Sequence, residues 1–414
     1  MKAKLIIIGN ELLYGRIRDT NGPWLAKWLD NQGIELEEIL VVKDDEKDLL
    51  EAFERAWNSS DLIITSGGIG PTLDDMTKAL LARFFKKELL PSKEAEAIVV
   101  ENYKYYDRSW TPELNTYHHI PEGFIVTPNP KGLAPGLVYQ AENKMIMAAP
   151  GVPRELQAMA EVEFLPLIKE YFKGRFEKKH RTVIRTSRVP EEKIFGELCP
   201  SLWKDLSAFG SVSSLPQIIG VDIIVTMSEE NALKNEELIK EYIKNSNLAE
   251  HVWQWGNEKL PELVVKEALE KGIKFSFAES CTGGLAASRI TDVPGSSGVL
   301  LSSLVTYSND AKTNILGVGG QTIKKYGAVS IETVKEMVVG VRDKTGADMA
   351  LAFSGIAGPT GGSVEKPIGT LALSWANKTE VNSEVFHFSG DRERLKLRFS
   401  EIGLFKLLQM IRAY

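Results

Sequence analysis

The feature that most constrains the fold of this sequence is a regular alternation of short apolar runs with helical stretches over its first ~165 residues. Strand-like and helix-like segments follow one another in the order Lys4–Ile8, Trp24–Gln32, Glu37–Val42, Asp48–Asn58 and Asp61–Thr65. Such alternation predicts a parallel, doubly wound sheet with helices on both faces. In that architecture, ligands bind beyond the carboxyl ends of the strands.

The length of the chain predicts more than one domain. It has 414 residues, whereas a domain usually holds ~100–200. Composition shifts near Lys173 to a charged segment poor in large apolar residues, and a second α/β pattern opens with a helix at Leu260–Lys271. We therefore expect a doubly wound N-terminal domain over residues 1–170, a small α+β connector domain over 171–252 and a C-terminal α/β domain over 253–414.

Composition and charge exclude several classes of protein. Hydrophobic residues make up 43% and charged residues 26% of the chain, which is typical of globular proteins and not of disordered ones. The 50 Lys and Arg against 56 Asp and Glu give a net charge of −6, which argues against direct nucleic-acid binding. The first apolar run is too short for a signal peptide or a membrane span. We expect a cytoplasmic protein without membrane association.

The few cysteines and histidines limit the metal chemistry. The two cysteines, Cys199 and Cys281, lie far apart, which excludes a disulfide scaffold and thiolate zinc sites. Because the whole chain has only five histidines, we expect any metal to be held by carboxylate oxygens.

The loops after the N-terminal strands combine glycines, hydroxyls and carboxylates. Three glycines and a threonine after Asp61–Thr65 fit a phosphate cradle, and two carboxylates beside them suit a hard divalent cation; these residues are Gly67, Gly68, Gly70, Thr72, Asp74 and Asp75. Glu11 and Asn21 follow the first strand and can converge on the same crevice, and Asp44 is a further candidate carboxylate. The structural alternative is a glycine turn with an aspartate near the start of the next helix.

The most informative segment of the C-terminal domain runs from Phe275 to Ser288. An alternating strand leads into hydroxyls and paired glycines and then into a helix, so backbone N–H groups are available to an anion. The alternative is that Ser280 or Thr282 merely caps the helix. Further along, the exposed amides of the glycine-rich loop that begins at Ser354 could form an oxyanion hole or a phosphate nest. Arg392 suits a phosphate by bidentate pairing, and a surface arginine is the alternative.

A lysine is the available base for a serine nucleophile in this domain. No histidine lies near these segments, so a Ser–Lys pair replaces the Ser-His-Asp triad as the candidate arrangement. Lys312 falls about one helical turn after Ser308, near the end of the strand Leu301–Tyr307. Desolvation would lower its pKa and allow it to act as a base, whereas a solvated helix lysine is the alternative.

The C-terminal domain resembles that of the CinA family of competence/damage-inducible proteins in six motifs: AESCTGG at Ala278–Gly284, GSS at Gly295–Ser297, TYSNDAK at Thr306–Lys312, GAVS at Gly327–Ser330, SGIAGPTGG at Ser354–Gly362 and SGDR at Ser389–Arg392. The resemblance implies a metal-free nicotinamide mononucleotide deamidase that needs no cofactor. It implies Ser297 as the nucleophile, with Ser296 as its rival, Lys312 as the base and Ser354, at a position where threonine is usual, in proton relay or oxyanion positioning. The implied substrate-binding residues are Ser280, Thr282, Gly283, Gly284, Tyr307, Gly355, Ala357, Gly358 and Arg392.

The N-terminal domain resembles the molybdopterin-binding superfamily, in the form that opens CinA proteins, through GGIGPTLDDMT, NPKGLAPG and APGVPRE. The resemblance implies an ADP-ribose pyrophosphatase that uses Mg²⁺, Mn²⁺ or Co²⁺ and is assisted by K⁺. The expected metal ligands are Asp44, Asp74 and Asp75, and the expected substrate-binding residues are Glu11, Asn21, Gly67, Gly68, Gly70, Thr72, Pro150 and Gly151.

Two other hypotheses stay open at this point. The N-terminal domain can be a non-catalytic nucleotide- or pterin-binding module, or the chain can be a competence factor that acts through DNA or a DNA-binding partner. The acidic balance argues against direct DNA contact. A homodimer is the default expectation for the assembly.

Overall fold

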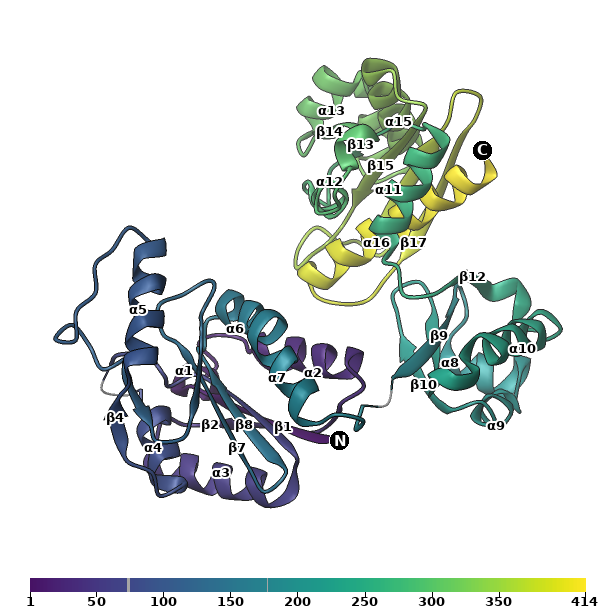
Figure 1. The fold of residues 1–414 in the computed structure, drawn as a ribbon. Helices are drawn as coiled ribbons and strands as arrows, with labels where there is room; N and C mark the ends of the chain where they lie inside the picture. The colour runs from purple at the N-terminus through teal and green to yellow at the C-terminus, as the bar shows by residue number, and fades with distance from the viewer. Residues whose placement is uncertain (73–74, 177) are drawn as a thin grey trace. The chain divides into compact units, whose positions relative to one another are not determined.

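The computed structural model describes residues 1–72, 75–176 and 178–414, and contacts between residues divide them into two compact units (Figure 1). Unit 1 comprises Met1–His180 with Met227–Ala232, and unit 2 comprises Arg181–Thr226 with Leu233–Tyr414. The expected connector range thus groups mainly with the C-terminal range. The division into three domains stays a prediction.

Unit 1 is built around a six-stranded sheet in the order β2-β1-β3-β8-β7-β6. Its elements are β1 (Lys2–Ile8), α1 (Asn10–Leu13), α2 (Asn21–Asn31), β2 (Glu35–Val42), α3 (Glu46–Ser59), β3 (Leu62–Ser66), α4 (Thr77–Phe84), β4 (Leu89–Pro91), α5 (Lys93–Tyr105), β5 (His119–Pro121), β6 (Ile125–Thr127), β7 (Gly136–Ala141), β8 (Lys144–Ala149), α6 (Pro153–Met159), the π-helical turn η1 (Ala160–Phe164) and α7 (Leu165–Tyr171).

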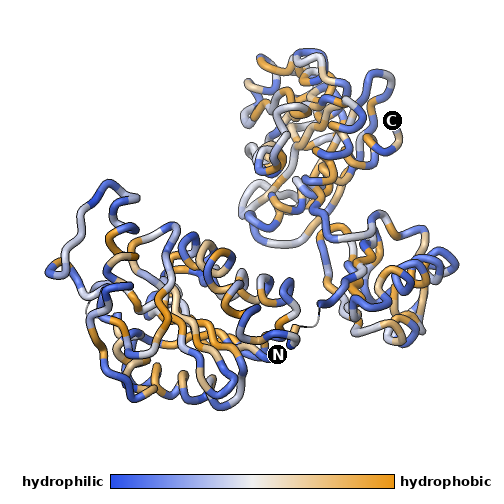
Figure 2. Tube along the Cα trace, in the orientation of Figure 1, coloured by the Kyte–Doolittle hydropathy of each residue, from blue (hydrophilic) through white to orange (hydrophobic). Residues whose placement is uncertain are grey.

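Helices cover both faces of this sheet, as the alternation in the sequence predicts. Leu5 and Ile7 of β1 pack in one core with α2, α6 and α7, whereas Ile6 and Ile8 pack in the other core with α3, α4 and α5. Figure 1 shows these two groups of helices on opposite faces of the sheet. Hydrophobic residues accordingly gather along the central strands (Figure 2). Within the described ranges, no helix combines the length and the apolar composition that crossing a bilayer requires.

The sheet of unit 1 is mixed, and the expectation of a parallel sheet holds only for part of it. Strands β2, β1, β3 and β8 run parallel, but β7 pairs antiparallel with β8 and β6 pairs antiparallel with β7. Only Glu142 and Asn143 join β7 to β8, and both have positive φ, 53° and 59°. A two-residue loop with this geometry forms a hairpin, since a parallel connection needs a dozen or more residues.

Unit 2 contains two sheets, ordered β10-β11-β9-β12 and β14-β13-β15-β16-β17. The elements of the first are β9 (Lys179–Thr186), α8 (Glu191–Lys193), η2 (Ile194–Leu198), α9 (Leu202–Ser207), β10 (Ser211–Pro216), β11 (Val221–Ser228), α10 (Ala232–Lys244), η4 (Ala249–His251) and β12 (Val252–Trp255). Between β11 and α10 the chain forms η3 (Glu229–Asn231), which groups with unit 1. The remaining elements are α11 (Leu260–Lys271), β13 (Phe275–Glu279), α12 (Leu285–Thr291), η5 (Ser296–Gly298), β14 (Leu300–Val305), α13 (Asn309–Leu316), α14 (Gly320–Tyr326), α15 (Ile331–Thr345), β15 (Met349–Gly355), β16 (Thr370–Ala376), β17 (Val381–His387) and α16 (Arg392–Ala413).

The second sheet is covered on both faces, which places its strand ends at a defined edge. Phe275 and Phe277 of β13 pack with α11, α12 and α16, while Ala278 packs on the opposite face with α13 and α15. Strand β13 runs parallel to both of its neighbours, β14 and β15. The carboxyl ends of these three strands therefore lie together.

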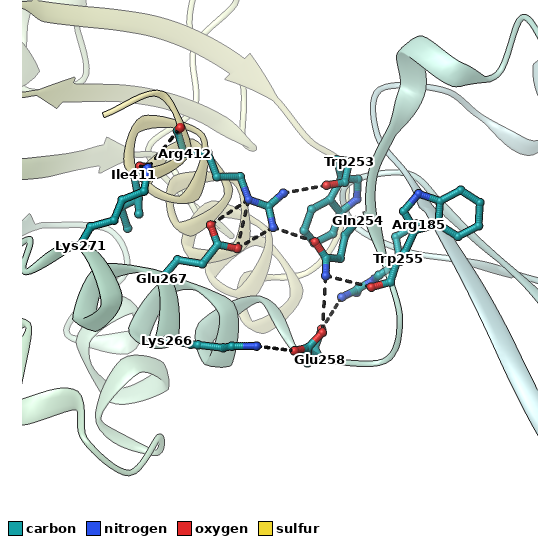
Figure 3. A network of polar contacts seen from close by, with 10 residues as sticks. All are labelled: Arg185, Trp253, Gln254, Trp255, Glu258, Lys266, Glu267, Lys271, Ile411 and Arg412. Carbon is teal, nitrogen blue, oxygen red and sulfur yellow. Dashed lines mark hydrogen bonds and ion pairs between the residues drawn. The ribbon is translucent and has the colours of Figure 1, made fainter. Parts of the chain in front are cut away.

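A polar network fastens β12 to the helices of the C-terminal sheet (Figure 3). The Arg412 guanidinium forms an ion pair with Glu267 of α11 at 2.7 Å and donates to the Trp253 carbonyl at 2.7 Å and to Gln254 Oε1 at 2.7 Å. Lys271 Nζ donates to the Ile411 carbonyl at 2.7 Å. These bonds explain why β12 groups with the C-terminal range.

Candidate functional site

The carboxyl ends of β13, β14 and β15 bring together three of the segments singled out in the sequence. Glu279 at the end of β13 is in register with Val305 of β14 and with Phe353 of β15. Ser280 follows directly, and its N–H donates to the Phe353 carbonyl at 3.0 Å. Ligands bind at this end of parallel strands in α/β folds.

Lys312 reaches this edge from α13. The Ser308 hydroxyl caps the helix by accepting from the Ala311 N–H at 3.0 Å, which sets Lys312 one turn inside it. The Lys312 side chain is only 1% exposed. Its Nζ lies 3.0 Å from Ser280 Oγ and donates to the carbonyls of Thr306 at 2.9 Å and Tyr307 at 3.2 Å.

The surroundings of Lys312 shift the pKa of its amine. Burial lowers the pKa of this lysine from 10.5, and the smaller opposing influence comes from Cys281. A neutral amine has two N–H bonds and one lone pair. In the structure Lys312 Nζ donates to Ser280 Oγ as well as to the carbonyls of Thr306 and Tyr307. Once the amine is neutral and its two N–H bonds serve the carbonyls, its lone pair faces Ser280 Oγ and can accept the hydroxyl proton.

The neighbouring Cys281 is a poor nucleophile despite its position. Its side chain is buried, and burial raises the pKa of its thiol to about 12. Because the thiolate is the reactive form of cysteine, almost none of it is present at neutral pH. The hydroxyl of Ser280 is therefore the better candidate in this loop.

A buried carboxylate, Glu279, holds the loop that carries Ser280. The two Glu279 oxygens accept from the N–H groups of Gly284 at 2.9 Å, Ala286 at 3.2 Å and Ala287 at 3.0 Å, and from the Ser303 hydroxyl at 2.9 Å. Gly284 has a φ of +94°, which favours glycine. Glu279 thus fixes the start of α12 and joins it to β14.

Replacing Glu279 with glutamine is expected to lower the free energy of unfolding by about 2–4 kcal/mol. The N–H and O–H groups that donate to Glu279 would lose a charged acceptor, and the glutamine NH₂ group would be buried facing other donors. Urea unfolding followed by circular dichroism measures this. The matched change Glu270→Gln, at an exposed position of α11, should leave the unfolding free energy within about 0.5 kcal/mol of the parent. Equal stability of the two variants would contradict this role for Glu279.

Other residues expected at this site lie around the same edge. Ser354 is buried, and its hydroxyl donates to the Ala328 carbonyl at 2.8 Å. Arg392 donates to the Gly358 carbonyl at 2.6 Å and to the Tyr307 hydroxyl at 3.1 Å. Tyr307 is 61% exposed, so its ring is open to a ligand.

In unit 1, the strand ends and the loops after them surround a cavity of about 600 Å³. Most residues expected from the sequence line it: Glu11, Asp44, Gly67, Gly68, Gly70, Asp75, Pro150 and Gly151. The cavity also has basic and aromatic lining residues that were not expected to bind a ligand. Tyr106, Arg108 and Tyr117 lie outside the quoted motifs, whereas Lys131 belongs to NPKGLAPG and Arg154 to APGVPRE.

Asn21 and Thr72 support this cavity without lining it. Asn21 Nδ2 donates to Ser66 Oγ at 2.9 Å and to the Gly151 carbonyl at 2.7 Å, so it joins the loop after β3 to the loop after β8. The Thr72 N–H and hydroxyl donate to Asp75 Oδ2 at 2.9 and 2.5 Å. Both residues therefore shape the loops around the cavity.

The expected metal ligands are only partly gathered. Asp44 and Asp75 line the same cavity, whereas Asp74 lies outside the described residues. Among the residues with described positions, no three carboxylate, imidazole or thiol groups are close enough to hold a metal ion. Two carboxylates fit Mg²⁺ chemistry only where substrate phosphates and waters complete the coordination.

Two further titratable groups of unit 1 have shifted pKa values. Burial lowers the pKa of Lys78 to about 8, and the opposing influence comes from Asp75. Burial also raises the pKa of Glu155, whose carboxylate lines the cavity and accepts from Asn129 Nδ2 at 2.8 Å.

Comparisons with known proteins place both regions in described families. Residues 257–411 match the CinA C-terminal domain, and residues 4–170 match the "probable molybdopterin binding domain". A competence-damage inducible protein of Clostridium beijerinckii is 35% identical over 414 residues, which covers 99% of this chain and 100% of that protein. The chain belongs to the CinA family.

A further relative and a solved structure are also similar to this chain. A competence-damage inducible protein of Caldicellulosiruptor saccharolyticus is 36% identical over 415 residues, and the match covers 100% of this chain and 100% of that protein. The crystal structure of the competence/damage inducible protein CihA from Agrobacterium tumefaciens is 36% identical, with a TM-score of 0.36, over 38% of this chain and 98% of that one.

In this CinA chain, the expected pairing of Ser297 with Lys312 is wrong. Ser296 and Ser297 lie in η5, before β14, whereas Lys312 follows the end of the same strand. The six residues of β14 separate the two ends of the sheet by about 20 Å. Ser297 is also exposed, and the hydroxyl that meets Lys312 is that of Ser280.

Some residues of the two candidate sites have roles that the sequence motifs did not indicate. Glu279 was part of a motif, but its role as the acceptor for the loop needs the positions of Gly284 and Ser303. The sequence offers one signal for this role, because Glu279 is a carboxylate at the last position of an otherwise mainly apolar strand. Arg108 and Arg154 line the unit 1 cavity from segments far apart in sequence, and no local pattern joins them.

Proposed function

We propose that the C-terminal domain hydrolyses the carboxamide of nicotinamide mononucleotide to nicotinic acid mononucleotide and ammonia. Ser280 acts as the nucleophile and Lys312 as its base. The observation that carries this proposal is the 3.0 Å contact between Lys312 Nζ and Ser280 Oγ, with two carbonyls occupying the other positions around the amine.

The reaction proceeds in two balanced halves. Ser280 Oγ bonds to the carboxamide carbon while its proton passes to Lys312 Nζ; the carbon–nitrogen bond then breaks as that proton reaches the leaving nitrogen, which departs as ammonia. Water next adds to the acyl carbon and gives a proton to Lys312. Lys312 returns the proton to Ser280 as the ester bond breaks, which frees the carboxylic acid.

The surrounding residues suit the rest of this substrate. The exposed Tyr307 ring can pack against the cationic pyridine ring, an interaction typical of aromatic faces. Arg392 is held by Tyr307 and Gly358, and it keeps N–H donors for a phosphate.

The test is ammonia release from nicotinamide mononucleotide by the intact chain, measured with a coupled dehydrogenase assay. Release that depends on the chain, with one nicotinic acid mononucleotide formed per ammonia, supports the proposal. A folded chain that releases no ammonia from this substrate would contradict it.

For unit 1 we propose cleavage of ADP-ribose to AMP and ribose 5-phosphate, assisted by a divalent metal. The supporting observation is a single cavity that combines the carboxylates of Asp44 and Asp75 with the cationic side chains of Arg108, Lys131 and Arg154. Asp44 and Asp75 would hold the metal, which would neutralise charge on the pyrophosphate.

A non-catalytic nucleotide- or pterin-binding module remains the alternative. The homodimer and the cytoplasmic location stay predictions.

Replacing Asp75 with asparagine is expected to lower AMP release by about a hundredfold or more, because the cavity loses a carboxylate that also fixes Thr72. Chromatography of AMP formed from ADP-ribose with added Mg²⁺ measures this. Ammonia release should not change, and the control Glu51→Gln on the exposed face of α3 should retain both activities. No AMP release by the parent chain with Mg²⁺, Mn²⁺ or Co²⁺ would instead favour the binding module.

A further inference from the structure

Glu155 is a carboxylate of the unit 1 cavity that is separate from the expected metal ligands. It lies in the first turn of α6, is half-buried and lines the cavity together with Asp44 and Asp75. Among the residues with described positions, no three acidic, histidine or cysteine side chains are placed to share a metal ion. Glu155 therefore does not complete a metal site with the two aspartates.

A buried amide fixes the orientation of the Glu155 carboxylate. Asn129 Nδ2 donates to Glu155 Oε2 at 2.8 Å and to the Ala134 carbonyl at 2.9 Å, which uses both of its N–H bonds. Asn129 Oδ1 accepts from the Lys131 N–H at 3.2 Å, so the amide would lose all three bonds if it turned over. Asn129 is only 2% exposed. The loop after β6 thus holds one oxygen of Glu155 in place.

The same loop accommodates the Glu155 carboxylate because residue 132 is glycine. A Cβ built on Gly132 would lie 1.9 Å from Glu155 Oε2, which no side chain allows. The carboxylate therefore packs directly against the backbone, which removes water from one side of it. Within the described ranges, Glu155 Oε1 has no hydrogen-bond partner. A base that a third group orients through one atom, with its other atom available, has this arrangement.

The surroundings of Glu155 also distinguish it from the other candidate bases of the cavity. Burial raises the pKa of Glu155, against the smaller influences of the Asn129 bond and the Arg154 charge, and a more basic carboxylate accepts a proton more readily. Glu11 also lines the cavity, but it is exposed to solvent. Burial raises the pKa of the Tyr117 hydroxyl, which therefore stays protonated and cannot act as a base.

We propose that Glu155 is the general base of unit 1 and takes a proton from the water that attacks the pyrophosphate. The proposal rests on the ADP-ribose hydrolysis proposed for this cavity. The water oxygen bonds to one phosphorus while its proton passes to Glu155 Oε1, and the bond from that phosphorus to the bridging oxygen breaks. The bridging oxygen keeps the electron pair and leaves with the second phosphate. Glu155 then gives its proton to solvent.

The kinetic test replaces Glu155 with glutamine, which keeps the shape of the side chain and an acceptor for Asn129 but removes the base. We expect kcat for AMP release from ADP-ribose with Mg²⁺ to fall about a hundred- to a thousandfold, with KM within about threefold of the parent. Chromatography of AMP measures both constants, and an unchanged melting temperature shows that the variant folds. The control Glu161→Gln, at an exposed position of η1, should behave as the parent.

The pH profile separates a base from a merely structural role. The carboxylate is the active form of Glu155, so kcat of the parent should rise with pH and level off above the pKa of this group. Because burial raises that pKa, the rise should extend above 4.5. In Glu155→Gln the rise assigned to this carboxylate should be absent. Binding of ADP-ribose without added metal, measured by calorimetry, should be the same for both chains.

The outcomes distinguish this role from the proposed activity itself. A parent chain that releases no AMP would refute the pyrophosphatase and the base together. An active parent with a Glu155→Gln chain that keeps more than a tenth of kcat would overturn the role of Glu155 alone. A raised KM with unchanged kcat would assign Glu155 to substrate binding and also overturn it, as would the same pH profile in both chains.

Discussion

Substituting alanine for Ser280 is expected to lower kcat for deamidation of nicotinamide mononucleotide by about 10⁴-fold or more, because the hydroxyl that meets Lys312 is the only nucleophile the proposed mechanism uses. The neighbouring Cys281 cannot replace it, since burial raises the pKa of the Cys281 thiol to about 12. Ammonia release measures the loss, and an unchanged melting temperature shows that the chain still folds.

Ser297→Ala is the matched control for this result. Ser297 lies at the opposite end of β14 and is exposed, so its alanine variant should keep deamidation within about threefold of the parent. Loss of activity in Ser297→Ala with retention in Ser280→Ala would show that the nucleophile is wrongly assigned.

Lys312→Met is expected to lower kcat by about 10³-fold or more, because Ser280 then has no acceptor for its proton. Lys312→Arg should lose as much, since a guanidinium does not deprotonate in this pH range. A Lys312→Arg variant that retained more than a tenth of the parent kcat would exclude a neutral base at this position.

The pH dependence of the parent chain follows from the same lysine. The neutral amine is the active form, so kcat/KM rises as pH increases and Lys312 loses its proton. Because burial lowers the pKa of Lys312, the rise is expected to level off clearly below 10.5. Stopped assays of ammonia from pH 6 to 10 measure the profile, and activity that falls with increasing pH over this range would contradict the role of Lys312.

Much of the fold could be predicted because local patterns specify it. The alternation of apolar runs with helices defines the helix-covered sheets, and Leu5 and Ile6 show how adjacent buried residues serve opposite faces. The antiparallel β7 was missed because periodicity gives no strand direction. The antiparallel direction is indicated by the short loop Glu142–Asn143, because two residues can join only antiparallel strands in a hairpin.

The candidate site could be predicted only in part. Residues that follow different strands meet at one edge of the sheet, although they lie far apart in the sequence. Ser280 and Lys312 were both singled out, since each follows a strand. Ser297 is closer to Lys312 in sequence, but a whole strand separates the two in space.

The covalent intermediate provides the most direct test of the central claim, that Ser280 attacks the carboxamide with Lys312 as its base. The chain is mixed with excess nicotinamide mononucleotide, quenched in acid at times from milliseconds to seconds, digested and analysed by mass spectrometry. We expect the peptide with Ser280 to carry the substrate's mass less that of ammonia, and the Ser280→Ala chain to carry none. Turnover with an adduct on another residue, or with none at any quench time, would contradict the proposed mechanism.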